Sequence, residues 1–284
     1  MSVRVSRARA VVANGRRVST VAKVAGVSRQ AIYKTPKRRP AKAGPGVSSE
    51  SDAAIIEVAK ANPTDGTRMV AALAARQLGV PVNRKRVQRI MRTHKLLQPV
   101  RGLDRRRRPG YFRVRRPDEL WHMDMTKVWT AQHGWVYLHV MVDCCTREVT
   151  GWTLDTRART IEAVACVEQA VLERRILPGR LTLGTDNGTQ FTSRNFRKHL
   201  SDRGITHRRG GYRDPESQAF IESWFGQFKK RVAWRSEWET IEQARRDIAT
   251  YVNEYHHRPH SGLRYKTPAE VAATWATTIN NSAT

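Results

Sequence analysis

Positive charge is distributed very unevenly along this chain of 284 residues, and the distribution restricts the folds available to it. Residues 1–116 carry 29 Lys and Arg against 5 Asp and Glu, whereas residues 117–284 carry 23 against 20. The first part therefore holds +24 of the total net charge of +27. Because like charges repel one another in a compact fold, we expect this part to form arms that bind a polyanion, with nucleic acid as the first candidate. The second part has the charge balance of an ordinary globular domain.

A helix-turn-helix pattern lies within residues 1–46, an N-terminal region that ends in a basic linker. Ala22 and Ile32 suit two packed helices, and Gly26 suits the turn between them. Ser28 is a good N-cap for the second helix. Three polar residues of that helix would face DNA, namely Arg29, Gln30 and Lys34. The alternative is a pair of short packed helices that makes no contact with DNA.

A second helical domain is predicted for residues 47–102. Its third helix, residues 84–94, can be capped by Asn83 and has one apolar stripe that suits burial. The rest of this helix is covered by cations that suit a DNA groove, among them Arg84, Lys85, Arg86 and Arg89. The alternative is a basic helix that only faces solvent.

A linker rich in arginine, residues 103–116, follows the second helical domain. It contains four arginines in a row, Arg105, Arg106, Arg107 and Arg108. Because the one acidic residue of this linker, Asp104, cannot pair with all four, we expect this run to stay extended and to contact phosphates.

The pattern changes to strands and helices in residues 117–257. Runs rich in β-branched and aromatic residues predict three antiparallel strands, and apolar periodicity then predicts helices that alternate with two short strands. This order indicates an α/β fold of the RNase H-like class, with a five-stranded mixed sheet flanked by helices and preceded by small all-α units. In the C-terminal tail, residues 258–284, Thr267 and Glu270 form a predicted capping box.

Three acidic residues of this predicted domain suit metal-assisted chemistry. Asp124 lies in the middle of a strand, Asp186 follows another strand, and Glu222 lies on a helix with Lys229 two turns further along the same face. Carboxylates brought together repel one another unless cations lie between them, and oxygen ligands suit Mg²⁺ or Mn²⁺. Two such ions can act on the attacking and leaving oxygens of a phosphodiester. The spacing of the acids alone is only suggestive.

The residues around these acids resemble one known family. The segments Trp121–Thr126, Asp143–Trp152, Thr185–Ser193 and Glu222–Lys229 are similar to motifs of insertion-sequence transposases of the second-frame (OrfB) type, which have a retroviral-integrase-like Asp-Asp-Glu core. The tail from Asn253 to Glu270 is similar to the end of such proteins. The resemblance implies that Asp124, Asp186 and Glu222 are the catalytic, metal-binding triad. It also implies Mg²⁺ or Mn²⁺ as cofactor, in two sites.

The resemblance further implies a DNA transposase that binds terminal inverted repeats, cleaves 3′ ends and transfers them to target DNA. Such a protein is expected to act as a homo-oligomer on DNA in the bacterial cytoplasm, associated with the nucleoid. The sequence contains no run of 18 apolar residues, so we expect no membrane span. One alternative is an RNase H-like nuclease without strand transfer, which Glu162 at the metal site would favour. The other is a non-enzymatic repressor derived from a transposon.

Asp143 is a competing candidate for a metal ligand, because it ends the strand next to that of Asp124. We prefer a structural interpretation in which Asp143 pairs with Arg147 across the following turn. In the tail, Arg258 and His260 are interpreted as exposed cations that either contact DNA or hold the tail against the core.

Overall fold

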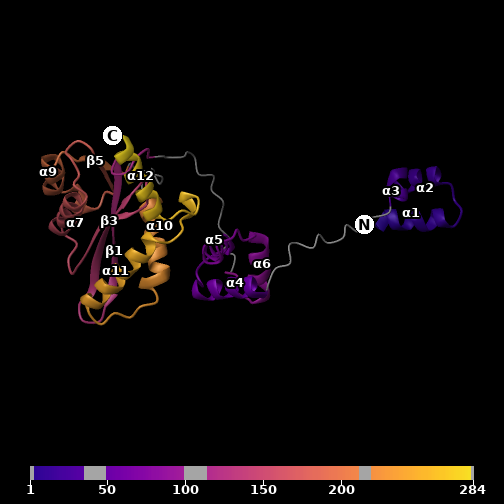
Figure 1. Ribbon diagram of the computed structural model, residues 1–284, viewed down its shortest axis with the longest axis horizontal. Helices are drawn as coiled ribbons and strands as arrows, with labels where there is room; N and C mark the ends of the chain where they lie inside the picture. Colours follow the sequence, from indigo (N-terminus) through magenta and orange to yellow (C-terminus); the bar gives the residue numbers. More distant parts are fainter. Residues whose placement is uncertain (1–2, 35–48, 99–113, 211–218, 283–284) are drawn as a thin grey trace. The chain divides into compact units, whose positions relative to one another are not determined.

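The structure, a computed structural model, describes residues 3–34, 49–98, 114–210 and 219–282 (Figure 1). The chain divides into two compact units, Met1–Ser49 and Glu50–Thr284. Arg105, Arg106, Arg107 and Arg108 lie outside the described residues, as does the predicted N-terminal basic linker.

The first unit is a small bundle of three helices. They are α1 (Val3–Ala13), α2 (Val18–Ala25) and α3 (Arg29–Tyr33). Gly26 ends α2 in the left-handed conformation, at a φ of 61°, and Ser28 caps α3 by accepting a hydrogen bond from the amide of Ala31. Arg9 of α1 donates to the carbonyl oxygens of Ala31 and Ile32, which fastens α3 to α1. The predicted turn and cap are therefore confirmed, and the structure adds α1 to them.

The second unit begins with another group of three helices, α4 (Ser49–Ala61), α5 (Thr67–Leu78) and α6 (Arg84–Thr93). Asn83 caps α6 as predicted, because its side chain accepts a hydrogen bond of 2.8 Å from the amide of Lys85. The apolar stripe of α6 is buried against α4 and α5, in a core of its own. Arg84, Lys85 and Arg89 of α6 are thereby left exposed.

The remainder of this unit is built on a five-stranded sheet in the order β3-β2-β1-β4-β5. The strands β1, β2 and β3 pair antiparallel, whereas β4 pairs parallel with both β1 and β5. The sheet is therefore mixed, as predicted. Its strands are β1 (Leu120–Thr130), β2 (Gly134–Asp143), β3 (Val149–Asp155), β4 (Thr182–Thr185) and β5 (Thr206–Arg209).

Helices cover both faces of the sheet (Figure 1). One face carries α7 (Thr160–Glu173), α8 (Thr189–Thr192) and α9 (Arg194–Asp202). The other face carries α10 (Ala219–Phe228) and α11 (Ile241–His256). A π-helical turn, Lys229–Ala233, extends α10, and a short 3₁₀ turn, Ser261–Leu263, precedes the last helix, α12 (Pro268–Ser282).

Alternation along β1 divides its side chains between the two faces. Trp121 and Met123 are fully buried in the core beneath α7 and α9, whereas Val128 lies in the core beneath α10 and α11. Since Asp124 differs from Val128 by an even number of positions, its side chain belongs to the α10 face. The sequence predicted this division, because Trp121 and Met123 alternate with Asp124.

Gly184 of β4 lets β1 and β4 approach beside the buried ring of His122. A Cβ atom at this position would lie 2.5 Å from the Cδ2 atom of His122. His122 is only 1% exposed, so its ring has little free volume into which to move.

We expect Gly184→Ala to destabilise the protein by about 1–3 kcal/mol, because the added methyl group overpacks the contact with His122. Urea denaturation would measure this change. The control is Gly226→Ala within α10, where a Cβ atom meets no other atom within 4 Å. That substitution should leave stability unchanged or raise it by up to about 1 kcal/mol. Equal stability of the two variants would contradict the described β1–β4 contact.

Candidate functional site

The parallel pairing of β1 with β4 sets Asp124 and Asp186 side by side. Trp121 pairs with Leu183 and His122 pairs with Gly184. If this register is continued for two residues, Asp124 lies next to Asp186, which directly follows the end of β4. Adjacent strands are about 4.8 Å apart, so two acids that are 62 positions apart in the chain become neighbours.

Glu222 approaches the same place from α10. The ring of Phe220 stacks on that of His122, with ring centroids 6.3 Å apart. His122 and Asp124 share one face of β1, and Glu222 is an exposed residue just after Phe220. The start of α10 therefore lies over the face of β1 that carries Asp124.

Electrostatic coupling connects the three acids. The pKa of Asp124 is raised to about 6, mainly by burial and in addition by the nearby negative charges of Asp186 and Glu222. Two effects act in the opposite direction, namely a hydrogen bond of 2.7 Å from the amide of Met125 and the positive charge of Lys229. The ionised form of Asp124 is thus disfavoured until a cation compensates for the surrounding negative charge.

Asp186 also shapes its own turn. Its Oδ1 atom accepts a hydrogen bond of 2.9 Å from the amide of Gly188, and Asn187 donates to the carbonyl oxygen of Gly210. This is the turn that an Asp-Asn-Gly sequence favours. The turn fixes the position of one carboxylate oxygen beside β1.

The donor set of this site consists of carboxylate oxygens, which suit Mg²⁺ or Mn²⁺. Within the described ranges, no group of three or more His, Cys, Asp or Glu side chains is arranged to hold a single ion. The fit of the three acids to a metal therefore rests on their chemistry and on the electrostatic coupling around Asp124.

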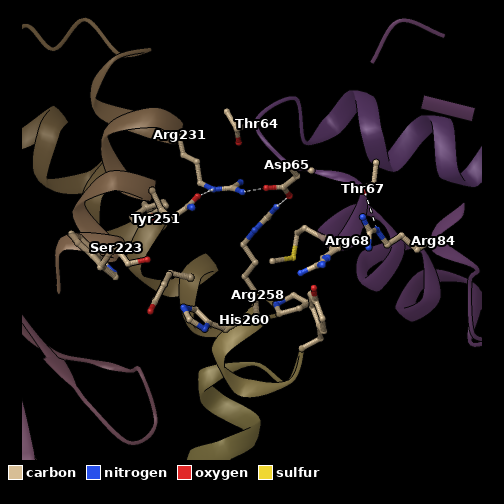
Figure 2. A pocket seen from close by; sticks show the side chains of 18 residues that line it. Thr64, Asp65, Thr67, Arg68, Arg84, Ser223, Arg231, Tyr251, Arg258 and His260 are labelled. Carbon is tan, nitrogen blue, oxygen red and sulfur yellow. Dashed lines mark hydrogen bonds and ion pairs between the residues drawn. The ribbon is translucent and has the colours of Figure 1, made fainter. Parts of the chain in front are cut away.

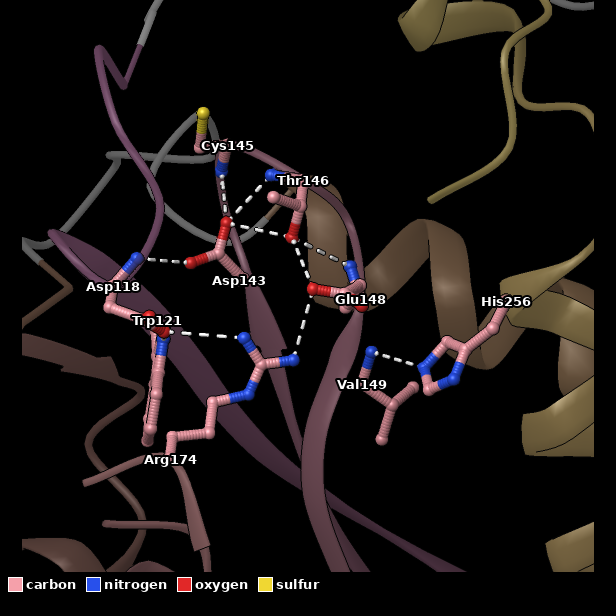
Figure 3. Close-up of polar contacts among 9 residues, drawn as sticks. All are labelled: Asp118, Trp121, Asp143, Cys145, Thr146, Glu148, Val149, Arg174 and His256. Atoms are coloured by element: carbon pink, nitrogen blue, oxygen red, sulfur yellow. Dashed lines mark hydrogen bonds and ion pairs between the residues drawn. The ribbon is translucent and has the colours of Figure 1, made fainter. Parts of the chain in front are cut away.

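Asp143 lies outside this site, and its side chain forms hydrogen bonds within the turn that follows β2 (Figure 3). It is fully buried, and its side chain accepts hydrogen bonds of 2.7 Å from the amides of Asp118, Cys145 and Thr146. The prediction of a structural role is therefore confirmed. The partner was predicted wrongly, because backbone amides rather than the guanidinium of Arg147 hold the carboxylate.

Neighbouring contacts extend this structural cluster (Figure 3). Arg174 of α7 donates to Glu148 at 3.0 Å, and Nε2 of His256 accepts a hydrogen bond of 2.9 Å from the amide of Val149. Glu162, the other competing acid, accepts hydrogen bonds from the backbone and guanidinium of Arg159 at the start of α7. Among the described residues, Glu162 thus has a structural role at a helix terminus.

The residues predicted to contact DNA differ in their exposure. Arg29, Gln30 and Lys34 are exposed in the first unit, and Arg84, Lys85 and Arg89 are exposed on α6. Arg86 faces α4 instead, where its Nε atom donates a hydrogen bond of 2.8 Å to Asp52 and its side chain is only 18% exposed. Lys229 is half-buried at the end of α10.

The tail residues are more buried than the sequence suggested. Arg258 forms an ion pair with Asp65 and donates a hydrogen bond of 2.8 Å to Asn62. Burial lowers the pKa of His260 to about 4. Arg258 and His260 are therefore only partly exposed, and Arg258 holds the tail as one of the two alternatives predicted, although its partner is Asp65 before α5 and not the core. The capping box of Thr267 and Glu270 is confirmed, with hydrogen bonds of 2.9 and 3.1 Å.

Comparison with protein families identifies three matching regions. Two models described as "Integrase core domain" match residues 114–215 and 203–268, and a model described as "HTH-like domain" matches residues 49–114. Within the described residues, no helix has the length and apolar character needed to cross a membrane.

Several curated proteins are similar to the chain. It is 30% identical over 222 residues to transposase InsD for insertion element IS2D of Escherichia coli (strain K12), a match that covers 73% of each chain. It is also 30% identical over 161 residues to the transposase for insertion sequence element IS904 of Lactococcus lactis subsp. lactis (strain IL1403). That match covers 56% of this chain and 63% of the relative, so it spans less than two thirds of the relative's length.

Among solved structures, the catalytic core domain of BIV integrase is similar to the chain, with 22% sequence identity and a TM-score of 0.44. The match covers 59% of this chain and 99% of that chain.

Replacing the Asp124 carboxylate should change how stability depends on pH. Because folding raises the pKa of Asp124 from about 3.9 to about 6, the folded state binds more protons between these values. Wild-type stability should therefore fall as the pH rises from about 4 to about 6. In EDTA at pH 8, Asp124→Asn should be more stable than the wild type by roughly 3 kcal/mol, and this difference should disappear below pH 4.

Urea denaturation across this pH range measures the effect. The control is Glu242→Gln, which removes an exposed carboxylate at the start of α11 and should not reproduce it. A constant difference between Asp124→Asn and the wild type at every pH would show that Asp124 is not buried among negative charges.

Proposed function

Because this chain belongs to the insertion-sequence transposases, we propose that it binds the terminal inverted repeats of its element, cleaves 3′ ends and transfers them to target DNA. Asp124, Asp186 and Glu222 are the proposed catalytic and metal-binding residues. The observation that carries the proposal is the β1–β4 register, which brings Asp124 beside Asp186 when it is continued by two residues, with Glu222 close enough for its charge to affect Asp124. Three acids from separate parts of the chain act on one another there, as a site for divalent cations requires.

The three carboxylates would hold two Mg²⁺ or Mn²⁺ ions. When bound, two such ions stabilise the attacking and leaving oxygens of a phosphodiester. The chain's own residues would position the reactants: the turn at Asp186 holds one carboxylate, and α10 brings Glu222 close enough for its charge to affect Asp124. Lys229 adds a positive charge close enough to affect Asp124, which suits a phosphate in the same place. The nucleophile is water in cleavage and a DNA 3′-hydroxyl group in strand transfer.

DNA binding is proposed for the exposed cations outside the core domain. On α6 these are Arg84, Lys85 and Arg89, and in the first unit Arg29 and Lys34, together with Gln30, are exposed. We propose that the protein acts as a homo-oligomer in the bacterial cytoplasm, because two element ends have to be held at once.

A donor oligonucleotide with a free 3′-hydroxyl group, incubated with target DNA and Mg²⁺, tests the reaction. Wild-type protein should produce joined DNA, whereas Glu222→Gln should produce neither cleaved nor joined DNA and should still bind the donor. Glu242→Gln is the matched control and should retain activity, because it lies on another helix. Cleavage without joined product would instead favour a nuclease, and DNA binding without either product would favour a repressor.

Arg89→Ala should weaken DNA binding and reduce the slope of log K against log salt concentration by about 0.9, the value expected for one lost phosphate contact. Fluorescence anisotropy at several salt concentrations measures both quantities. The control is Arg180→Ala, which removes an exposed arginine outside α6. If both variants keep the wild-type slope, Arg89 does not contact phosphate.

A further inference from the structure

A cavity of 540 Å³ lies beside the proposed active site (Figure 2). It is lined by the start of α5, by α10 and α11, and by the segment that follows α11. Ser223 lines the cavity and directly follows Glu222 on α10, so one helix contributes to both places. The cavity therefore lies next to the DNA strand that Glu222 is proposed to act on.

Positive charge dominates the lining of this cavity. It contains four arginines, Arg68, Arg84, Arg231 and Arg258, and one carboxylate, Asp65. Asp65 is only 6% exposed, and its two oxygens are engaged by Arg231 and Arg258 (Figure 2). Within the described part of the chain, no carboxylate pairs with Arg68 or Arg84. An anion is the ligand that such a lining favours.

Two buried hydrogen-bond donors in the same lining have no acceptor. Among the described residues, neither the indole nitrogen of Trp224 nor the hydroxyl group of Tyr251 has a hydrogen-bond partner, and the two residues are only 1% and 5% exposed. A buried polar group without a partner costs about 1–3 kcal/mol. Both groups can donate to the same kind of ligand, one that offers oxygen acceptors.

The backbone at the start of α5 adds further donors. Gly66 occupies the N-cap position, and no side chain caps this helix of 12 residues. Amide groups of the first turn carry partial positive charge and favour an anion at this end. Gly66, Thr67 and Arg68 all line the cavity.

We propose that this cavity binds a backbone phosphate of the DNA, close to the phosphodiester that is cleaved. A phosphate is anionic and offers only acceptors, so it matches the unpaired arginines, the two buried donors and the start of α5. The volume of the cavity also admits the attached sugar. This assignment rests on the proposed function, since it requires DNA to lie across α10.

Tyr251→Phe tests the assignment because it removes only a hydroxyl group that has no partner in the free protein. Binding of a short fluorescein-labelled DNA duplex, measured by anisotropy in EDTA, should weaken about fivefold, the effect of losing one hydrogen bond of about 1 kcal/mol. The melting temperature should stay constant or rise. Tyr137→Phe, a half-buried tyrosine of β2, is the matched control and should change neither quantity. Wild-type affinity in Tyr251→Phe overturns the proposal.

Neutral DNA backbones identify phosphate as the ligand. Two further duplexes carry uncharged methylphosphonate linkages, the first duplex in one strand and the second duplex in the other strand. The difference in affinity between the wild type and Tyr251→Phe should disappear with one of these duplexes. If the difference persists with both, the hydroxyl group acts through the protein and the assignment is overturned.

Arg68→Gln provides an independent variant, because Arg68 is exposed and its loss should not affect folding. It should reduce the salt slope of binding by about 0.9, whereas Arg246→Gln, an exposed change on α11, should not. An unchanged slope for Arg68→Gln counts against the phosphate site. These binding measurements need no metal ion, so they test DNA binding by the cavity independently of metal-dependent cleavage. Failure of the proposed function would appear as absent cleavage by a protein whose binding still depends on Tyr251.

Discussion

The parallel pairing of β1 with β4 is the constraint on which the candidate site depends. It sets Asp124 beside Asp186, and the close approach at Gly184 and His122 leaves no room for a larger residue between the strands. The α10 helix completes the arrangement, because it packs on β1 through Phe220 and brings the charge of Glu222 close enough to affect Asp124. Bringing the three acids together is electrostatically unfavourable, because burial and the two other acids oppose ionisation of Asp124. Such a concentration of negative charge would favour the divalent cations of the proposed site.

A second electrostatic arrangement connects the small helical domain of α4, α5 and α6 with the core domain. Asp65 lies between Arg231 and Arg258, and Arg76 of α5 forms a bidentate pair with Glu270 of α12, both distances being 2.7 Å. The exposed Arg76–Glu270 pair contributes little net stability, and at the buried Asp65 desolvation offsets most of the attraction. These ion pairs do select one relative position, because any displacement would leave Asp65 without partners. The proposed phosphate cavity depends on that position.

Much of the fold was predictable from local patterns. Strand composition, helical periodicity, the cap at Asn83 and the capping box at Thr267 act over a few residues and appear in the structure as expected. The structural role of Asp143 was also predicted, although its partners were not. Those partners include the amide of Asp118, which lies 25 positions earlier in the chain. A contact over that distance leaves no local signal in the sequence.

By itself, the sequence determined the class of fold, the resemblance to transposases and the identity of the three candidate acids, because each depends on short motifs or on periodicity. The tertiary structure alone decided which of the candidate cations are unpaired and exposed: Arg86 is paired with Asp52, Arg258 with Asp65, and His260 is half-buried. It also decided that Trp224 and Tyr251 line one cavity with Arg68. The physical reason is that burial and ion pairing depend on residues far apart in the chain, and only the folded chain brings these together.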